Sequence, residues 1–291
     1  MKLKEKIIET LLLASSLLTI ATTISIIGVL IYQAGNFFSE VSIVDFLTDT
    51  EWTPLFSNKR FGILPLFSGT LLTTLIAILV AVPMGLTIAI YLSQYAHKKV
   101  RNIVKPLLEV LAAVPTVVYG YFALVYVTPA LQAIIPGLAG FNALSPGIVM
   151  GIMILPLISS LSEDALHSVP KFLREGSFAM GATKFQTSWR VMIPAAFSGI
   201  AVSIILAISR AIGETMIVAV AAGQQPRLTF NPLVPVETAT TYIVQVSMGD
   251  VPHDSIEYRT IFAVGISLFV VTFILNNVSF WLKKRYQATY R

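Results

Sequence analysis

The chain has 291 residues, of which 55% are hydrophobic and only 12% are charged. Soluble domains average about 25% charged residues, so this composition excludes an ordinary soluble protein and indicates an integral membrane protein. The net charge of +5 would suggest a nucleic-acid partner in a soluble protein, but the basic residues lie at the edges of apolar segments. Membrane topology and a bilayer with anionic lipid explain that placement, and no nucleic acid is expected. The chain has no cysteine, which excludes disulfides, thiolate metal sites and cysteine nucleophiles.

Six apolar segments are candidates for membrane-spanning helices, because a hydrocarbon core of about 30 Å requires about 20 residues. The fourth segment is short and is interrupted by Pro156. We therefore expect an all-α integral membrane protein with about six transmembrane helices, which form a single domain over residues 1–291. The segments are Leu11–Tyr32, Ile63–Leu92, Leu107–Val127, Pro146–Leu161, Ala195–Ala222 and Thr260–Leu282.

The distribution of Lys and Arg predicts the orientation of these helices, since the cytoplasmic segments of membrane proteins are enriched in both residues. Fifteen of them fall on the side of the N-terminus, and four fall in loops on the opposite side. Both termini are therefore expected in the cytoplasm, together with a loop over about residues 162–194. The first apolar run exceeds the roughly 7–15 residues of a signal-peptide core, so it is expected to remain as a helix. The outer loops, near 33–62 and 223–259, are long enough to contact another molecule.

Charges within the apolar segments are candidates for function, because an Arg near the bilayer centre costs about 2.5–3.5 kcal/mol to insert. Arg210 and Glu214 lie near the middle of the fifth segment, and their spacing would place both on one helical face. A guanidinium can meet two oxygens of a tetrahedral oxyanion, and a neighbouring carboxylate can accept a hydrogen bond from a protonated one. Phosphate carries a proton near neutral pH and sulfate does not, so such a pair favours phosphate. The expected substrate pathway comprises Arg210, Glu214, Ser209 and Thr215.

A structural interpretation of the same pair is also open, in which Arg210 and Glu214 neutralise each other without binding a ligand. Glu109, at the cytoplasmic end of the third segment, is expected to reach water. The three histidines, His97, His167 and His253, are scattered over expected loops and predict no metal site. No G-x-x-x-x-G-K-[ST] loop or catalytic constellation occurs, so the chain is expected neither to bind ATP in that manner nor to act as an enzyme, and no cofactor is expected.

The loop between the fourth and fifth segments carries a spaced pattern that consists of Glu175, Gly176, Ser177, Gly181, Val191, Ile193 and Pro194. The acidic residue, two small residues, glycine and apolar-x-apolar-Pro ending resemble the cytoplasmic loop of permease subunits of binding-protein-dependent ABC importers. The resemblance implies the type I importer permease fold and a contact with an ATPase. We expect a short helix here, with Gly181 in a tight turn and Pro194 just before the fifth membrane helix.

Four further stretches resemble the phosphate-specific ABC permeases, a system that pairs two related subunits called PstC and PstA. They are Phe61–Thr70, Glu109–Gly120, Gly151–Pro156 and Arg210–Thr215. The stretch from Glu109 to Gly120 is more similar to PstC than to PstA, and the transport-critical Arg and Glu of the family map onto Arg210 and Glu214.

This resemblance implies import of inorganic phosphate by alternating access across the bacterial cytoplasmic (inner) membrane. It implies four kinds of partner: a second permease of the PstA type, a PstB-type dimer that hydrolyses ATP, a periplasmic phosphate-binding protein of the PstS type, and the lipid bilayer. Two alternatives are open. A permease for molybdate or sulfate would share the loop but would not need Glu214, and a secondary transporter would follow an ion gradient.

Overall fold

The computed structural model of the chain describes residues 2–287, and regular structure within that range is helical apart from two isolated β-bridges. In chain order the elements, with π-helical turns marked η, are α1 (Lys2–Phe38), α2 (Ile43–Thr48), α3 (Leu64–Ile90), η1 (Tyr91–Tyr95), α4 (Lys98–Ala113), α5 (Thr116–Phe122), η2 (Ala123–Val127), α6 (Thr128–Gln132), α7 (Leu144–His167), α8 (Lys171–Ala179), α9 (Lys184–Thr187), η3 (Ser188–Met192), α10 (Ile193–Ala195), α11 (Phe197–Ile212), α12 (Met216–Ala221), α13 (Ala239–Met248) and α14 (Ile256–Gln287).

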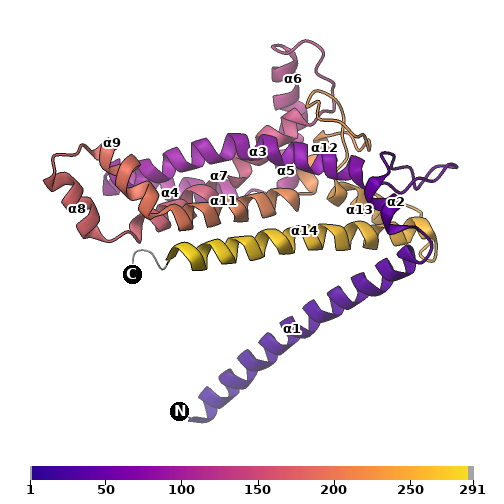
Figure 1. Cartoon of the computed structure of the whole chain (residues 1–291), viewed down its shortest axis with the longest axis horizontal. Coiled ribbons are helices and arrows are strands. Elements are labelled where there is room, and N and C mark those ends of the chain that lie inside the picture. Colours follow the sequence, from indigo (N-terminus) through magenta and orange to yellow (C-terminus); the bar gives the residue numbers. More distant parts are fainter. Residues whose placement is uncertain (1, 288–291) are drawn as a thin grey trace.

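The long helices run along the longest axis of the molecule (Figure 1). α7 packs against both α3 and α11, and α14 packs against α11 and α1. α1 approaches α14 near the end that carries α2 and α13, and then diverges from the other helices (Figure 1). The short helices α8 and α9 lie at the opposite end, and the first residues of α1 and the last described residues of α14 extend toward that same end (Figure 1).

Four helices are long and apolar enough to cross a membrane, and six spans result if each of two bent helix pairs counts as one. These numbers agree with the prediction of about six transmembrane helices. The fourth predicted segment, Pro146–Leu161, proves to be the centre of a longer helix: α7 has 24 residues, and 67% of its most apolar stretch is buried.

Two of the predicted segments are not single straight helices. The third, predicted as Leu107–Val127, bends by 89° between α4 and α5. The cause is Pro115, which has no N–H to donate and which forces the preceding Val114 into an extended conformation with ψ of 131°. The fifth, predicted as Ala195–Ala222, starts after a bend of 73° at Ala196 and is interrupted again at Gly213–Thr215, between α11 and α12.

Glycines allow α3 and α7 to approach closely at the centre of the bundle. A Cβ atom added at Gly151 would lie 2.8 Å from the carbonyl oxygen of Ala77, and one added at Gly147 would lie 2.8 Å from the Ile76 side chain. The two glycines are four residues apart, so both lie on the face of α7 that meets α3. Small residues at such spacing are the usual means by which spanning helices pack at short distance.

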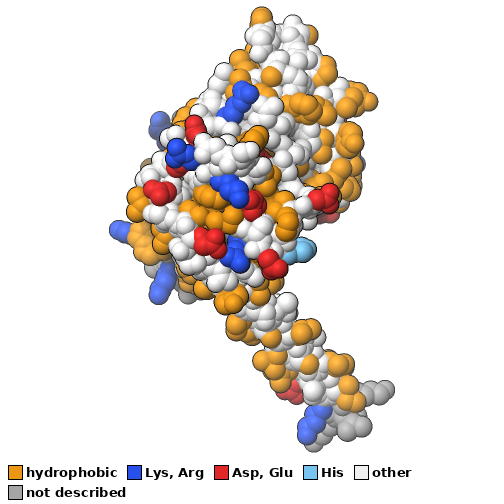
Figure 2. All heavy atoms as spheres, turned by 90° about the vertical axis from the view of Figure 1, so that its right-hand side faces the viewer, with side chains coloured by type: hydrophobic (Ala, Val, Ile, Leu, Met, Phe, Trp, Pro, Cys, Tyr) orange, Lys and Arg blue, Asp and Glu red, His pale blue; other side chains and the backbone are white. Residues whose placement is uncertain are grey.

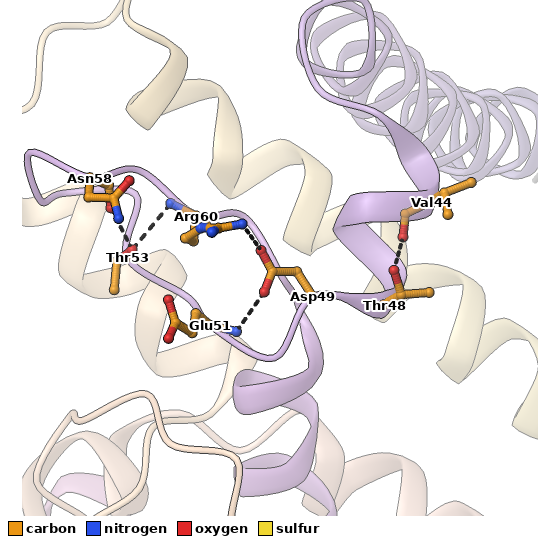
Figure 3. Close-up of polar contacts among 7 residues, drawn as sticks. All are labelled: Val44, Thr48, Asp49, Glu51, Thr53, Asn58 and Arg60. Carbon is orange, nitrogen blue, oxygen red and sulfur yellow. Dashed lines mark hydrogen bonds and ion pairs between the residues drawn. The ribbon is translucent and has the colours of Figure 1, made fainter.

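The end of the molecule that carries α2 and α13 is covered by loops, and basic and acidic side chains are intermixed on it (Figure 2). Ion pairs on these loops join Lys59 to Glu257, Arg60 to Asp49 and Arg259 to Glu40. The Thr53 N–H donates to the Arg60 carbonyl at 2.9 Å and closes the loop after α2. The Thr53 hydroxyl donates to the Asn58 carbonyl and accepts from the Arg60 N–H (Figure 3). The long loops at this end of the molecule are therefore ordered structures with internal bonds.

Candidate functional site

A cavity of about 430 Å³ lies between α4, α7 and α11. It brings together charged side chains from three helices that are far apart in the sequence, α4, α7 and α11. Its lining consists of Lys105, Leu108, Glu109, Ala112, Met153, Pro156, Leu157, Ser160, Glu163 and Arg210. Two cations and two carboxylates in one cavity between apolar helices indicate a path for a charged solute.

Arg210 lies in the last turn of α11 and is exposed to this cavity. Its Nη2 atom is 3.6 Å from the Met153 Sδ, and within residues 2–287 no ion pair joins it to a carboxylate. The partial negative charge at a helix C-terminus favours a cation in the last turn, which lowers the cost of a guanidinium there. Apart from the Nη2 donor that meets Met153, the N–H donors of Arg210 are available to oxygen atoms of a solute.

Glu214 does not share a helical face with Arg210, because the helix ends at Ile212 and Glu214 lies in the break before α12. Its side chain is 8% exposed, and its Oε1 accepts a hydrogen bond of 3.4 Å from the backbone N–H of Ile217. The prediction that Arg210 and Glu214 lie on one helical face is therefore wrong. Arg210 and Glu214 also form no ion pair with each other in this conformation, because the Glu214 carboxylate accepts a hydrogen bond at the start of α12.

The two other predicted pathway residues also lie outside the cavity lining. Ser209 donates to the Asn276 Oδ1 of α14 at 3.5 Å. Thr215 lies in the break, and its hydroxyl donates to the Gly213 carbonyl at 3.4 Å. Of the four residues proposed from the sequence, Arg210 alone lines the cavity. Glu109, which was expected only to reach water, is exposed and lines the cavity as well.

Sequence reasoning missed a buried carboxylate at the other end of the cavity. Glu163 on α7 is 1% exposed, and its two oxygens are paired with two cations of α4: Oε1 with Arg101 Nη2 at 2.8 Å and Oε2 with Lys105 Nζ at 2.9 Å. The predicted fourth segment ended at Leu161, so Glu163 fell in the cytoplasmic loop expected over about residues 162–194. The spacing of four between Arg101 and Lys105 was a usable signal, because it places both cations on one face of α4.

The predicted loop pattern folds into a compact helical segment, α8 to α10, which begins after His167 and not at residue 162. Glu175, Gly176 and Ser177 lie within α8, and the Ser177 hydroxyl is 2.9 Å from that of Thr187, which joins α8 to α9. Gly181 has a φ of +79°, the left-handed conformation that glycine adopts without steric cost, so the expected tight turn is confirmed. Thr183 and Gln186 then form a capping box that starts α9.

The end of the pattern anchors this segment to the bundle. Ile193 packs with the buried cluster of Leu166, Met192 and Ile200, and Val191 is partly buried. Pro194 lies in the first turn of α10, and a single residue, Ala196, separates α10 from α11. Large apolar side chains nevertheless remain exposed on the outer surface of the segment, namely Phe172, Met180, Phe185 and Trp189.

A cavity lined by charged side chains between spanning helices, with a separate ordered segment at one end, fits one class of protein, a membrane permease. The chain belongs to the family described as binding-protein-dependent transport system inner membrane component, whose model matches residues 81–288. The chain is thus a transport subunit and not an enzyme, as the sequence predicted.

Relatives with informative names cover most of the chain. It is 35% identical over 245 residues to the probable ABC transporter permease protein YqgH of Bacillus subtilis, with 84% of this chain and 79% of the relative covered. It is 33% identical over 265 residues to the phosphate transport system permease protein PstC of Mesorhizobium japonicum, with the same two shares covered. PstC of Xylella fastidiosa is 34% identical, with 79% of this chain and 75% of the relative covered.

Solved structures support the fold. A bacterial alginate ABC transporter in complex with its periplasmic protein aligns over 97% of this chain and 96% of that chain, with a TM-score of 0.63 and 19% identity. The MetNI methionine ABC transporter, in an inward-facing conformation, aligns over 77% of this chain and 94% of that chain, with a TM-score of 0.56 and 17% identity. The predicted ABC importer permease fold is therefore confirmed.

Proposed function

We propose that the chain is a PstC-type permease subunit that carries inorganic phosphate inward across the bacterial cytoplasmic membrane. The observation that carries the proposal is the exposure of Arg210 to a cavity that a second cation, Lys105, also lines. The names of the PstC relatives support phosphate as the substrate.

The cavity supplies the chemistry that a protonated oxyanion requires. The guanidinium of Arg210 can donate two parallel hydrogen bonds to phosphate oxygens. The carboxylate of Glu109 lines the same cavity and can accept a hydrogen bond from the hydroxyl of hydrogen phosphate, a donor that sulfate lacks. We assign to Glu109 in this conformation the acceptor role that the sequence suggested for Glu214. Glu214 would take part only if the break at Gly213–Thr215 rearranged during transport.

ATP-driven motion reaches this cavity through the segment α8–α10, which we place on the cytoplasmic side together with both termini. The exposed Phe185 and Trp189, which stack with ring centroids 6.4 Å apart, provide an apolar surface for a PstB-type ATPase. Since α10 leads into α11 after one residue, a displacement of the segment would move the helix that carries Arg210. The outer loops would receive a PstS-type binding protein, and a PstA-type permease would complete the pathway.

Uptake of radiolabelled phosphate and sulfate by the assembled transporter in proteoliposomes tests the proposal. Replacing Arg210 with Ala removes charge-assisted hydrogen bonds and should lower phosphate uptake by about ten- to a hundredfold, with assembly on the ATPase intact. Arg285→Ala, at the end of α14, is the matched control. Uptake by Arg210→Ala at the parent rate would contradict the proposal, and uptake that survives loss of ATPase activity would favour a secondary transporter.

Selectivity then distinguishes the two carboxylates and the alternative oxyanions. We expect Glu109→Gln to lose discrimination against sulfate and Glu214→Gln to affect it less. A parent transporter that carries sulfate or molybdate as readily as phosphate would refute the phosphate assignment.

A further inference from the structure

We propose that Arg101 and Lys105 form a second anion-binding position, which the carboxylate of Glu163 occupies when no phosphate is bound there. Phosphate that leaves Arg210 displaces Glu163 from this position. The inference rests on the proposed function and deepens it, because it assigns the exit half of the pathway. It concerns residues that neither the sequence pattern nor the names of the relatives single out.

The first support is the stoichiometry of the cluster. One buried carboxylate faces two cations, each at ion-pair distance, and a third group, His167, lies 3.1 Å from the Arg101 Nη1 through its Nε2. Arg101 and Lys105 are 34% and 33% exposed, so a solute can reach them, whereas Glu163 is 1% exposed. The two positive charges are therefore paired with a single carboxylate, and both side chains remain partly exposed to a solute.

The second support is the alignment of charges along two helices. On α7, Met153 lies beneath Arg210, and Glu163 follows ten residues later, which corresponds to about 15 Å of helix. On α4, Glu109, Lys105 and Arg101 recur every four residues and so share one face. The charges thus form a line from Arg210 to the end of α7, where the chain continues into α8.

The third support is continuity with the cavity. Lys105 and Glu163 line the same 430 Å³ space as Arg210, so one continuous cavity joins Arg210 to Lys105. Hydrogen phosphate carries more negative charge than a carboxylate and offers more acceptor oxygens, so it can displace Glu163 from the two cations. Glu163 is buried and loses its counter-charges when this happens, which is costly. When Glu163 pairs with the two cations again, it expels the phosphate, so the phosphate does not stay bound at this position.

The alternative is that the ion pairs serve only to attach α4 to α7. Binding of radiolabelled inorganic phosphate to the assembled, nucleotide-free transporter, without binding protein, separates the two. Glu163→Gln should bind phosphate about tenfold more tightly than the parent, and its maximal uptake rate in proteoliposomes should fall about tenfold because release is slow. Adding Lys105→Gln to this variant should abolish the extra affinity. Asp164→Asn, an exposed neighbour outside the cavity, is the matched control.

Glu163→Asp covers the case in which the Gln variant does not assemble. It keeps the charge and withdraws the carboxylate by one methylene, so it should raise phosphate affinity to an intermediate degree. Unchanged phosphate affinity in either variant, with or without a loss of thermal stability, would overturn the inference in favour of simple attachment. A parent transporter that imports phosphate normally would leave the proposed function intact in that event, whereas a parent that imports none would refute the proposed function itself.

Discussion

Arg210 and Glu163 represent two solutions to placing a charge among apolar helices. Arg210 has no carboxylate partner within the described part of the chain and lies where the dipole of α11 favours a cation. Glu163 is buried and is held by two cations from another helix. The donors of Arg210 therefore remain available to a solute, whereas those of Arg101 and Lys105 are occupied by Glu163 until a competing anion displaces it.

Another buried acid, Glu237, lies between α12 and α13, outside the spanning helices, and permits a prediction on pH. It is 2% exposed, and burial raises the pKa of its carboxyl from 4.5 to about 8. Below pH 4.5 the folded and unfolded chains are both protonated. Between pH 4.5 and 8 the unfolded chain releases a proton that the folded chain keeps, so stability falls as pH rises, by at most about 1.4 kcal/mol per unit.

Glu237→Gln should remove this slope and raise the thermal unfolding temperature at pH 8 more than at pH 4.5. Unfolding of the detergent-solubilised protein across this pH range measures the effect. Glu51→Gln, an exposed acid of the same outer region, should leave the slope unchanged. Equal slopes for the parent and for Glu237→Gln would contradict the prediction.

At the residue scale, the sequence predicted Arg210 because a lone charge in an apolar run stands out. It did not predict Glu163, since the apolar run around Pro156 appeared to end two residues earlier. Nor did it assign Lys105 to the cavity, because a Lys near a helix end also suits the membrane interface. Which of these charges meet depends on the packing of α4 against α7, which no local pattern encodes.

At the scale of elements, the contact between α3 and α7 is the one most dependent on small residues. Gly151→Ala should lower stability by about 1–3 kcal/mol, because the new methyl group would lie 2.8 Å from the Ala77 carbonyl and the helices would have to separate. Thermal unfolding measures the loss. Gly28→Ala on α1, with nothing within 4 Å, is the control and should be neutral or slightly stabilising. An equal effect of both substitutions would refute the role of close approach.

The apolar segments predicted the positions of the helices well and their directions poorly. Hydropathy identified each spanning region because a run of about 20 apolar residues is typical of a transmembrane helix. It could not predict the bends, although Pro115 was a visible reason for one of them. The break at Gly213–Thr215 was not predicted, because Arg210 and Glu214 were assigned to one helical face and a single glycine is tolerated inside a helix.

At the scale of the whole molecule, the segment α8–α10 and the outer loops lie at opposite ends of the bundle (Figure 1). The chain has no native cysteine, so single cysteines can report which end faces the cytoplasm. Met180 at one end and Phe230 in an outer loop are 88% and 72% exposed. A membrane-impermeant maleimide should label Phe230→Cys in intact spheroplasts and Met180→Cys only in inverted vesicles. The reverse pattern would refute the proposed orientation.

None of the residues of α4 is buried, which sets this helix apart from α3 and α7. Its ion pairs with α7 are made by Arg101 and Lys105, and partly buried side chains such as Leu111 add apolar contact, whereas α3 and α7 are joined by buried apolar residues. At physiological ionic strength the Debye length is about 8 Å, and pairs of 2.8 and 2.9 Å that include a buried carboxylate are screened far less than separated surface charges. Physiological salt should therefore leave this helix attached, and a competing anion that reaches Arg101 and Lys105 would loosen it instead.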